Sequence, residues 1–137
     1  MILVDTGPLV ALFDPRDGQH RRCRDVLRDV GASLLTTVPV LVETFHMLTP
    51  DSPGAQRLRD FLRQRGLRVW FLDEPAMGRA LDLMDRYADH PMDLADASLV
   101  VAAEVLDIRR IFTLDRGDFS TYRVSRGKHQ AAFEIIP

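Results

Sequence analysis

The sequence predicts an α/β fold built on a mainly parallel sheet of about five strands. Short apolar runs alternate with longer segments of helical periodicity along the 137 residues, and this alternation is typical of a parallel sheet covered by helices. Hydrophobic residues make up 46% and charged residues 28%, which is an ordinary balance for a folded protein. No repeat, low-complexity tract or linker interrupts the pattern, so we expect a single domain over residues 1–137.

The first half of the chain is expected to contain two of the strands. Residues 2–4 (ILV) form the first strand, and a short helix from Pro8 and a longer helix over residues 16–30 follow it. Residues 33–37 (SLLTT) form the second strand, and residues 38–48 (VPVLVETFHML) form the next helix.

The second half continues the alternation. Ser52 is a candidate cap, and Pro53 suits the first position of a helix that we expect to end near Gln64. The remaining expected elements are, in order, a strand over residues 67–72, a helix from Pro75 to about Ala88, a helix over residues 93–106, a strand over residues 110–114 and a fifth strand over residues 132–136.

Composition limits the classes of partner and of site. A formal net charge of −2 leaves no global basic field for nucleic acid, although the 18 basic residues are 17 Arg and one Lys, Lys128. Arg suits bidentate phosphate contacts, and the codon bias of a GC-rich genome explains the same excess. Cys23 is the only cysteine, which excludes an intrachain disulfide or a thiolate metal cage. With no basic leader and no apolar run near the ~20 residues of a membrane span, we expect a cytoplasmic protein with no membrane association.

Four acids far apart in the sequence are predicted to meet at one edge of the sheet. Asp5 directly follows the first strand, and Asp115 directly follows the strand over residues 110–114. A helix that feeds a parallel strand begins at the carboxyl edge of the sheet, which places Asp96 on that same edge. Glu43 lies in the first half of the helix after the second strand and can face it too. Ligands of such sheets bind beyond the carboxyl ends of the strands.

Each acid also has an ordinary structural interpretation. Asp5 can start a turn, Glu43 can be a solvated helix residue and Asp115 can be a loop acid. Asp93 suits the N-cap of its helix, with Asp96 at the third helical position, where the helix dipole favours a negative charge.

The chemistry of the combined set favours a metal site. Several carboxylates in one apolar cleft repel one another and lose hydration, and a bound cation relieves both costs. Oxygen-only ligands suit Mg²⁺ or Mn²⁺, and acids around such cations are typical of phosphoryl chemistry. The sequence contains no Walker loop or GxGxxG motif that would indicate another phosphate site.

At these residues the chain resembles the PIN-domain ribonucleases, and specifically the VapC-like toxins of type II toxin–antitoxin systems. The resemblance covers nearly the whole chain, and it is carried by four segments in order: ILVDTGPLVALFD, TVPVLVETFHML, MDLADASLVVAAEVLDIRRIFTLD and the DF at 118–119. It implies a three-layer α/β/α PIN-like fold and a Mg²⁺- or Mn²⁺-dependent endoribonuclease. It also implies a homodimer and a small antitoxin protein, VapB-like or similar, that blocks the site.

The resemblance further implies that the acid quartet of this family corresponds to Asp5, Glu43, Asp96 and Asp115. In this hypothesis the quartet holds one or two cations and cuts an RNA substrate. Thr6 and Thr113 match hydroxyl residues of the family motifs and are candidates for contacts to the acids or to a phosphate.

The sequence does not decide the roles of two further acids, Asp118 and Asp93. The family often shows T-x-D-x-D-F, whereas this chain has TLDRGDF with Gly117 inserted. Asp115 keeps the T-x-D spacing and is preferred, with Asp118 as a substitute or helper. Asp93 is explained by its cap role and is an additional candidate for the metal.

Two other classes of function are weighed against the nuclease. An aspartyl-phosphate phosphatase with Asp5 as nucleophile requires an acid two residues later, where Gly7 stands. A receiver-like or inactive PIN binding module requires no catalysis, but a receiver has an acidic pair beside the first strand and a Lys after the last. Lys128 is in the wrong place for that Lys.

Overall fold

The computed structural model describes residues 1–137 and contains the expected parallel sheet. Five strands pair in the order β3-β2-β1-β4-β7, and every pairing is parallel. The strands are β1 (Ile2–Val4), β2 (Leu34–Thr37), β3 (Leu67–Trp70), β4 (Arg110–Phe112) and β7 (Glu134–Ile136). No helix is long and apolar enough to cross a lipid bilayer.

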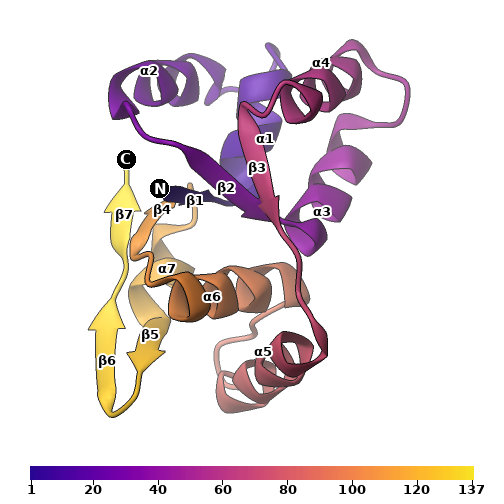
Figure 1. The fold of residues 1–137 in the computed structure, drawn as a ribbon. Helices are drawn as coiled ribbons and strands as arrows, with labels where there is room; N and C mark the ends of the chain where they lie inside the picture. Colours follow the sequence, from indigo (N-terminus) through magenta and orange to yellow (C-terminus); the bar gives the residue numbers. More distant parts are fainter.

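Seven helices cover the two faces of the sheet. They are α1 (Thr6–Phe13), α2 (His20–Val30), α3 (Val38–Leu48), α4 (Pro53–Arg63), α5 (Glu74–Arg86), α6 (Leu94–Leu106) and α7 (Arg116–Thr121). Figure 1 shows α1, α2 and α4 on one side of the sheet and α5 and α6 on the other. The predicted three-layer α/β/α fold is therefore confirmed.

Most element boundaries follow the local signals in the sequence. α3 has the predicted bounds, and α4 begins at Pro53, after the Ser52 side chain accepts a hydrogen bond from the amide of Ala55. α1 begins at Thr6, two residues before the predicted Pro8, because Asp5 caps it. Local capping chemistry thus decides where these helices start.

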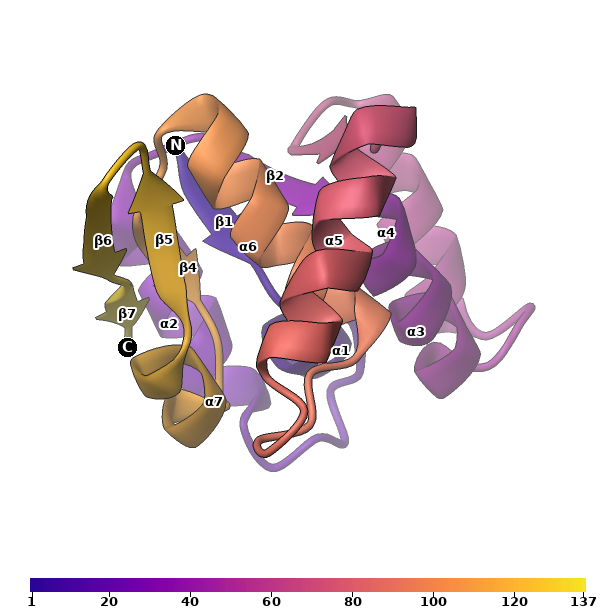
Figure 2. The ribbon, with the colours of Figure 1, turned by 90° about the horizontal axis from the view of Figure 1, so that it is seen from below.

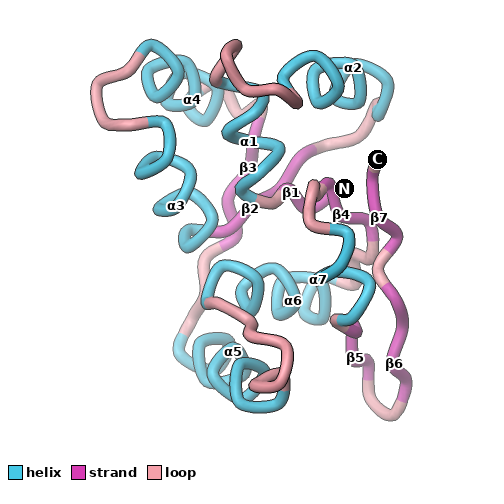
Figure 3. Tube along the Cα trace, turned by 180° about the vertical axis from the view of Figure 1, so that it is seen from behind, coloured by secondary structure: helices cyan, strands magenta, loops and turns pink.

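Residues 116–132 contain elements that the sequence pattern did not predict. A short helix, α7, is followed by an antiparallel hairpin of β5 (Arg123–Arg126) and β6 (His129–Ala132). Figure 3 shows this hairpin projecting beyond the main sheet. Its strands are mostly polar and half-exposed, so they lack the apolar run that marks the sheet strands. As a result, the fifth sheet strand begins at Glu134, later than the predicted residue 132.

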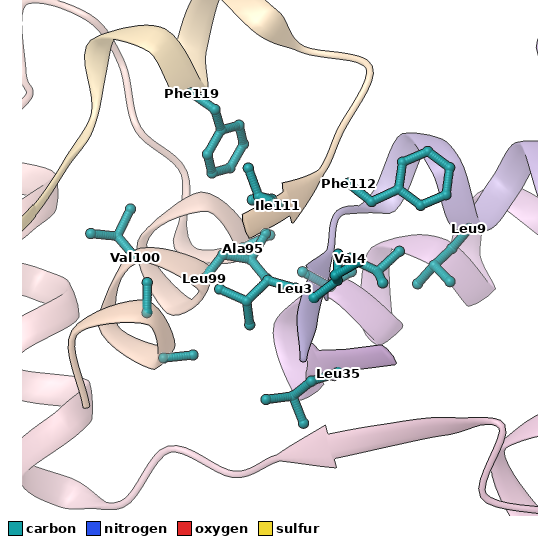
Figure 4. Packing of buried hydrophobic residues seen from close by; sticks show 14 of the residues in the cluster. Leu3, Val4, Leu9, Leu35, Ala95, Leu99, Val100, Ile111, Phe112 and Phe119 are labelled. Carbon is teal, nitrogen blue, oxygen red and sulfur yellow. The ribbon is translucent and has the colours of Figure 1, made fainter. Parts of the chain in front are cut away.

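The core lies on both faces of β1. All three residues of β1 are fully buried, and the α6 residues from Ala97 to Ala103 are buried as well. Figure 4 shows Leu3 and Val4 packed among Leu35, Leu99 and Ile111, which come from β2, α6 and β4. Burying a Leu or Val side chain contributes about 1.5–3 kcal/mol, so this packing fixes the strand ends that carry the acids.

The connections place a topological switch point beside β1. From β1 the chain passes to β2 and β3 on one side, and it later returns to β4 and β7 on the other. Figure 2 shows α6, which leads into β4, lying beside β1 between α5 and the β5–β6 hairpin. The carboxyl ends of β1 and β4 therefore flank the crevice in which open α/β sheets bind ligands.

Candidate functional site

Asp5 lies at this switch point and is held by hydrogen bonds from both sides. Its backbone amide donates to the carbonyl of Phe112, which continues the pairing of β1 with β4. Its Oδ1 accepts from the amide of Thr6 at 2.8 Å, and its Oδ2 accepts from the hydroxyl of Thr113 at 2.8 Å. Asp5 is only 8% exposed, and these bonds hold its carboxylate in place.

Burial makes the Asp5 carboxylate costly to ionise. It raises the pKa of Asp5 to about 6, although the hydrogen bonds from Thr113 and Thr6 oppose the rise. The negative charges of Glu43 and Asp93 raise the pKa further. A carboxylate in this position gains from a nearby cation.

Glu43 is brought to Asp5 through a shared neighbour, Thr6. The hydroxyl of Thr6 donates to Oε1 of Glu43 at 2.8 Å, and the amide of the same residue donates to Asp5. Burial raises the pKa of Glu43, and the charge of Asp93 adds to the rise. Glu43 is thus a half-buried acid that faces the carboxyl edge, as the sequence predicts.

Asp93 and Asp96 divide the two roles that the sequence allows for them. Asp93 is the N-cap of α6, because its Oδ1 accepts from the amide of Asp96 at 2.8 Å. The pKa of Asp96 is raised to about 7, first by burial and then by the charges of Asp93 and Asp5. Asp93 therefore both caps the helix and contributes negative charge to the cluster.

Asp115 and Asp118 lie on either side of the start of α7. Asp115 is the N-cap, because its Oδ1 accepts from the amide of Asp118 at 3.1 Å, and its own amide donates to the hydroxyl of Thr113. Asp118 contacts His90, with Nε2 2.5 Å from Oδ1. The pKa of Asp118 is raised, first by the neighbouring Asp115 carboxyl and then by burial.

The charge of Asp93 raises the pKa of Asp5, Glu43 and Asp96, and Asp5 is further affected by Glu43 and itself raises the pKa of Asp96. The charge of Asp118 also raises the pKa of Asp96. Asp115 is exposed, and its charge acts on Asp118. Of the two acids in the TLDRGDF segment, Asp118 is thus the one whose charge raises the pKa of Asp96.

Two side chains that lie at the site, Tyr122 and His90, are not predicted there from the sequence. The hydroxyl of Tyr122 donates to Oδ2 of Asp96 at 3.1 Å, and His90 contacts Asp118. His90 lies three residues before the Asp93 cap, which was the only signal that it belongs to this edge. Tyr122 lies 26 residues from Asp96, and no local pattern links them.

The donor set fits a hard divalent cation in its chemistry. All the acids offer oxygen, and burial together with mutual repulsion raises the pKa of Asp5, Glu43 and Asp96. As the side chains stand, no three His, Cys, Asp or Glu groups are arranged to hold a metal ion. A surface hollow of about 760 Å³ lies elsewhere and is lined mainly by α2 residues with Gly18, Arg110 and Ile136.

These acids should make the stability of the metal-free protein depend on pH. The pKa of Asp5 rises from 3.8 to about 6 and that of Asp96 from 3.8 to about 7, so the folded state binds more protons than the unfolded state in this window. We expect the free energy of unfolding to fall as pH rises from about 4 to about 7. The expected loss is on the order of 3 kcal/mol, dominated by Asp5 because Asp96 is partly exposed.

Urea unfolding in EDTA at several pH values measures this loss. Other carboxylates add their own pH dependence, so the informative quantity is the difference between the wild type and the Asp5→Asn/Asp96→Asn variant. The variant should lose less stability between pH 4 and pH 7 than the wild type. Equal losses in the two proteins would contradict the account of the buried acids.

Comparison with known proteins places the chain in a family. Residues 2–124 match the PIN domain family. Ribonuclease VapC26 of Mycobacterium tuberculosis is 29% identical over 139 residues, which cover 99% of this chain and all of that protein.

Three solved structures share the fold. Mycobacterium tuberculosis VapC20, described as a sarcin-ricin loop cleaving toxin, superposes with a TM-score of 0.72 at 19% identity, over 81% of this chain and 87% of its own. A toxin–antitoxin complex from Klebsiella pneumoniae gives a TM-score of 0.69 at 20% identity, over 88% and 92% of the two chains. FitAcB from Neisseria gonorrhoeae gives 0.63 at 20% identity, over 87% and 91%. At these identities the likeness establishes the fold.

Proposed function

Because the chain belongs to the PIN-domain family, we propose that it is a Mg²⁺- or Mn²⁺-dependent endoribonuclease that acts as the toxin of a toxin–antitoxin pair. The observation that carries this proposal is the group of desolvated carboxylates at the switch point, where Asp5 and Asp96 have strongly raised pKa values. The name of the full-length relative, a ribonuclease, supports RNA as the substrate.

In this proposal Asp5, Glu43 and Asp96 hold the cation together with Asp118 or Asp115. The cation, when bound, clamps phosphate oxygens, lowers the pKa of a water and stabilises the departing ribose oxygen. The four acids come from four separate segments, so their relative positions in the proposed site depend on the fold.

The chain's own hydroxyl groups orient the acids. The hydroxyl of Thr113 donates to one oxygen of Asp5 and the backbone amide of Thr6 donates to the other. Together these two hydrogen bonds limit rotation of the carboxylate. The hydroxyl of Thr6 does the same for Glu43. Such outer contacts hold ligating carboxylates in position, and their loss costs about 10–100-fold in metal affinity or activity. Thr6 and Thr113 are therefore proposed to orient the metal ligands.

The direct test is cleavage of labelled tRNA, rRNA and mRNA by the purified protein with Mn²⁺. Endonucleolytic fragments from at least one RNA are expected. Failure to cut any RNA, combined with tight binding to a small partner protein, would instead favour a non-enzymatic binding module.

The fourth acid is expected to be Asp118. Since Asp118 acts on Asp96 whereas Asp115 is exposed and caps α7, Asp118→Asn should lower kcat by about 100-fold and Asp115→Asn by about 10-fold. Both variants remove one carboxylate from the same helix start, so each is the matched control for the other. Initial cleavage rates at saturating RNA and Mn²⁺ measure the difference. A larger loss in Asp115→Asn would assign the role to Asp115.

We also propose that the protein forms a homodimer and binds a small antitoxin protein. Large apolar side chains stay exposed on α3 and at the end of β3: Val42 is 64% and Phe71 is 71% exposed. Val38, also exposed, precedes Val42 by one helical turn, and Val38 and Phe71 each directly follow one residue of the Thr37–Trp70 pair. Such apolar groups are typical of a protein interface. Light scattering that gives the 15.5 kDa mass of one chain would contradict the dimer.

A further inference from the structure

Tyr122 is a buried aromatic residue whose one polar side-chain atom, the hydroxyl, contacts the acidic cluster. The residue follows α7 directly and is fully buried. Its hydroxyl donates to Oδ2 of Asp96 at 3.1 Å. The contact joins the start of α6 to the segment between α7 and β5, which are 26 residues apart.

The ring of Tyr122 is held from three sides. Phe119 and Tyr87 pack against it edge to face, with ring centroids 5.2 Å and 5.1 Å away. His90 packs against it at 5.9 Å, also edge to face. Aromatic rings in this arrangement attract each other, and a fully buried ring among them has a fixed orientation. The hydroxyl therefore reaches Asp96 from a rigid base.

We propose that Tyr122 is a positioning residue for Asp96, and this inference rests on the proposed metal-dependent function. Rotation about the last bond of an Asp side chain is broad, so its carboxylate has no strong intrinsic orientation. The hydroxyl of Tyr122 fixes Oδ2 of Asp96 and leaves Oδ1 available to a cation. Asp5 is oriented by Thr113 in the same way, with a hydroxyl on one oxygen.

Tyr87 shows what a purely structural tyrosine looks like in the same cluster. It packs against Tyr122, but its hydroxyl accepts a hydrogen bond from the backbone amide of Arg123 and contacts no acid. Replacing either tyrosine with Phe removes one hydroxyl from the same aromatic group. Tyr87→Phe is therefore a matched control for Tyr122→Phe.

The test is the affinity for Mn²⁺, measured by calorimetry on the full chain without RNA. Tyr122→Phe is expected to bind Mn²⁺ about 10-fold more weakly than the wild type, at the lower end of the range for contacts behind a metal ligand. Tyr87→Phe is expected to bind as the wild type does. Equal weakening in both variants, no weakening in Tyr122→Phe, or weakening accompanied by its unfolding in a thermal melt would each overturn the assignment.

A double-mutant cycle shows whether Tyr122 acts through Asp96. In the Asp96→Asn background, the further change Tyr122→Phe should leave the remaining Mn²⁺ affinity unaltered, because the carboxylate it positions is gone. A further 10-fold loss would overturn the inference. If the wild type bound no Mn²⁺ and cut no RNA, the proposed function itself would fail, which is a different result from an unaltered Tyr122→Phe.

Discussion

Asp96→Asn is expected to abolish RNA cleavage, with a loss of about 10³-fold or more in kcat/KM, while the fold stays intact. Asp96 stands in the first turn of α6, and its carboxylate is surrounded by the charges of Asp93, Asp5 and Asp118. Asn has the same shape but carries no charge, so it coordinates a divalent cation poorly. The buried core of α6, from Ala97 to Ala103, does not change, because Asp96 itself is only partly buried.

The same substitution should not destabilise the metal-free protein at pH 7.5. Burial raises the pKa of Asp96 to about 7, so the ionised carboxylate is unfavourable there and a neutral amide removes that cost. Asp85→Asn, on the exposed face of α5, is the matched control and should keep wild-type cleavage. Cleavage rates and thermal melts of the three proteins decide the matter. Wild-type cleavage by Asp96→Asn would remove Asp96 from the site, and an unfolded variant would indicate a structural role.

Removal of divalent cations is expected to have an equally large effect. Dialysis against EDTA should abolish cleavage, and added Mn²⁺ or Mg²⁺ should restore it, because no Arg or Lys side chain pairs with the acids of the site and His90 contacts only Asp118 among them. Binding should also stabilise the fold. At a Mn²⁺ concentration about 100 times Kd, the gain in the free energy of unfolding is about 2.7 kcal/mol.

Thermal melts with and without Mn²⁺ separate this gain from non-specific effects. The Asp5→Asn/Asp96→Asn variant retains the fold's surface charges elsewhere, so any general effect of the ion persists in it. The rise in melting temperature should therefore appear in the wild type and vanish in the variant. An equal rise in both proteins would place the ion somewhere else.

Much of the fold is predictable because its signals are local. The apolar run of β1, the Ser52–Pro53 start of α4 and the Asp93 cap of α6 each lie within a few residues of the element they define. Parallel pairing then follows from the alternation of strands and helices. This parallel arrangement brings Asp5 and Asp96 to the same carboxyl edge of the sheet. The hairpin of β5 and β6 could not be predicted, because its polar strands carry no apolar run.

The finer geometry of the site depends on contacts between distant segments. His90 meets Asp118 across 28 residues, Tyr122 meets Asp96 across 26, and Thr113 meets Asp5 across 108. Side-chain contacts of this kind depend on how α7 and the loop before α6 pack in three dimensions. For the same reason, spacing within TLDRGDF favours Asp115 as the fourth acid, whereas the charge of Asp118 is the one that raises the pKa of Asp96.

Our central proposal is that the acids at the switch point hold a cation. RNA is then cut with water as the nucleophile. Mass spectrometry of the fragments made by the purified protein tests it most directly, because the chemical ends of each fragment record the nucleophile. Attack by water with departure of the ribose 3′-oxygen leaves a 5′-phosphate and a 3′-hydroxyl. We expect these ends in Mn²⁺ and no fragments in EDTA. Fragments that end in a 2′,3′-cyclic phosphate, or that form equally in EDTA, would contradict it.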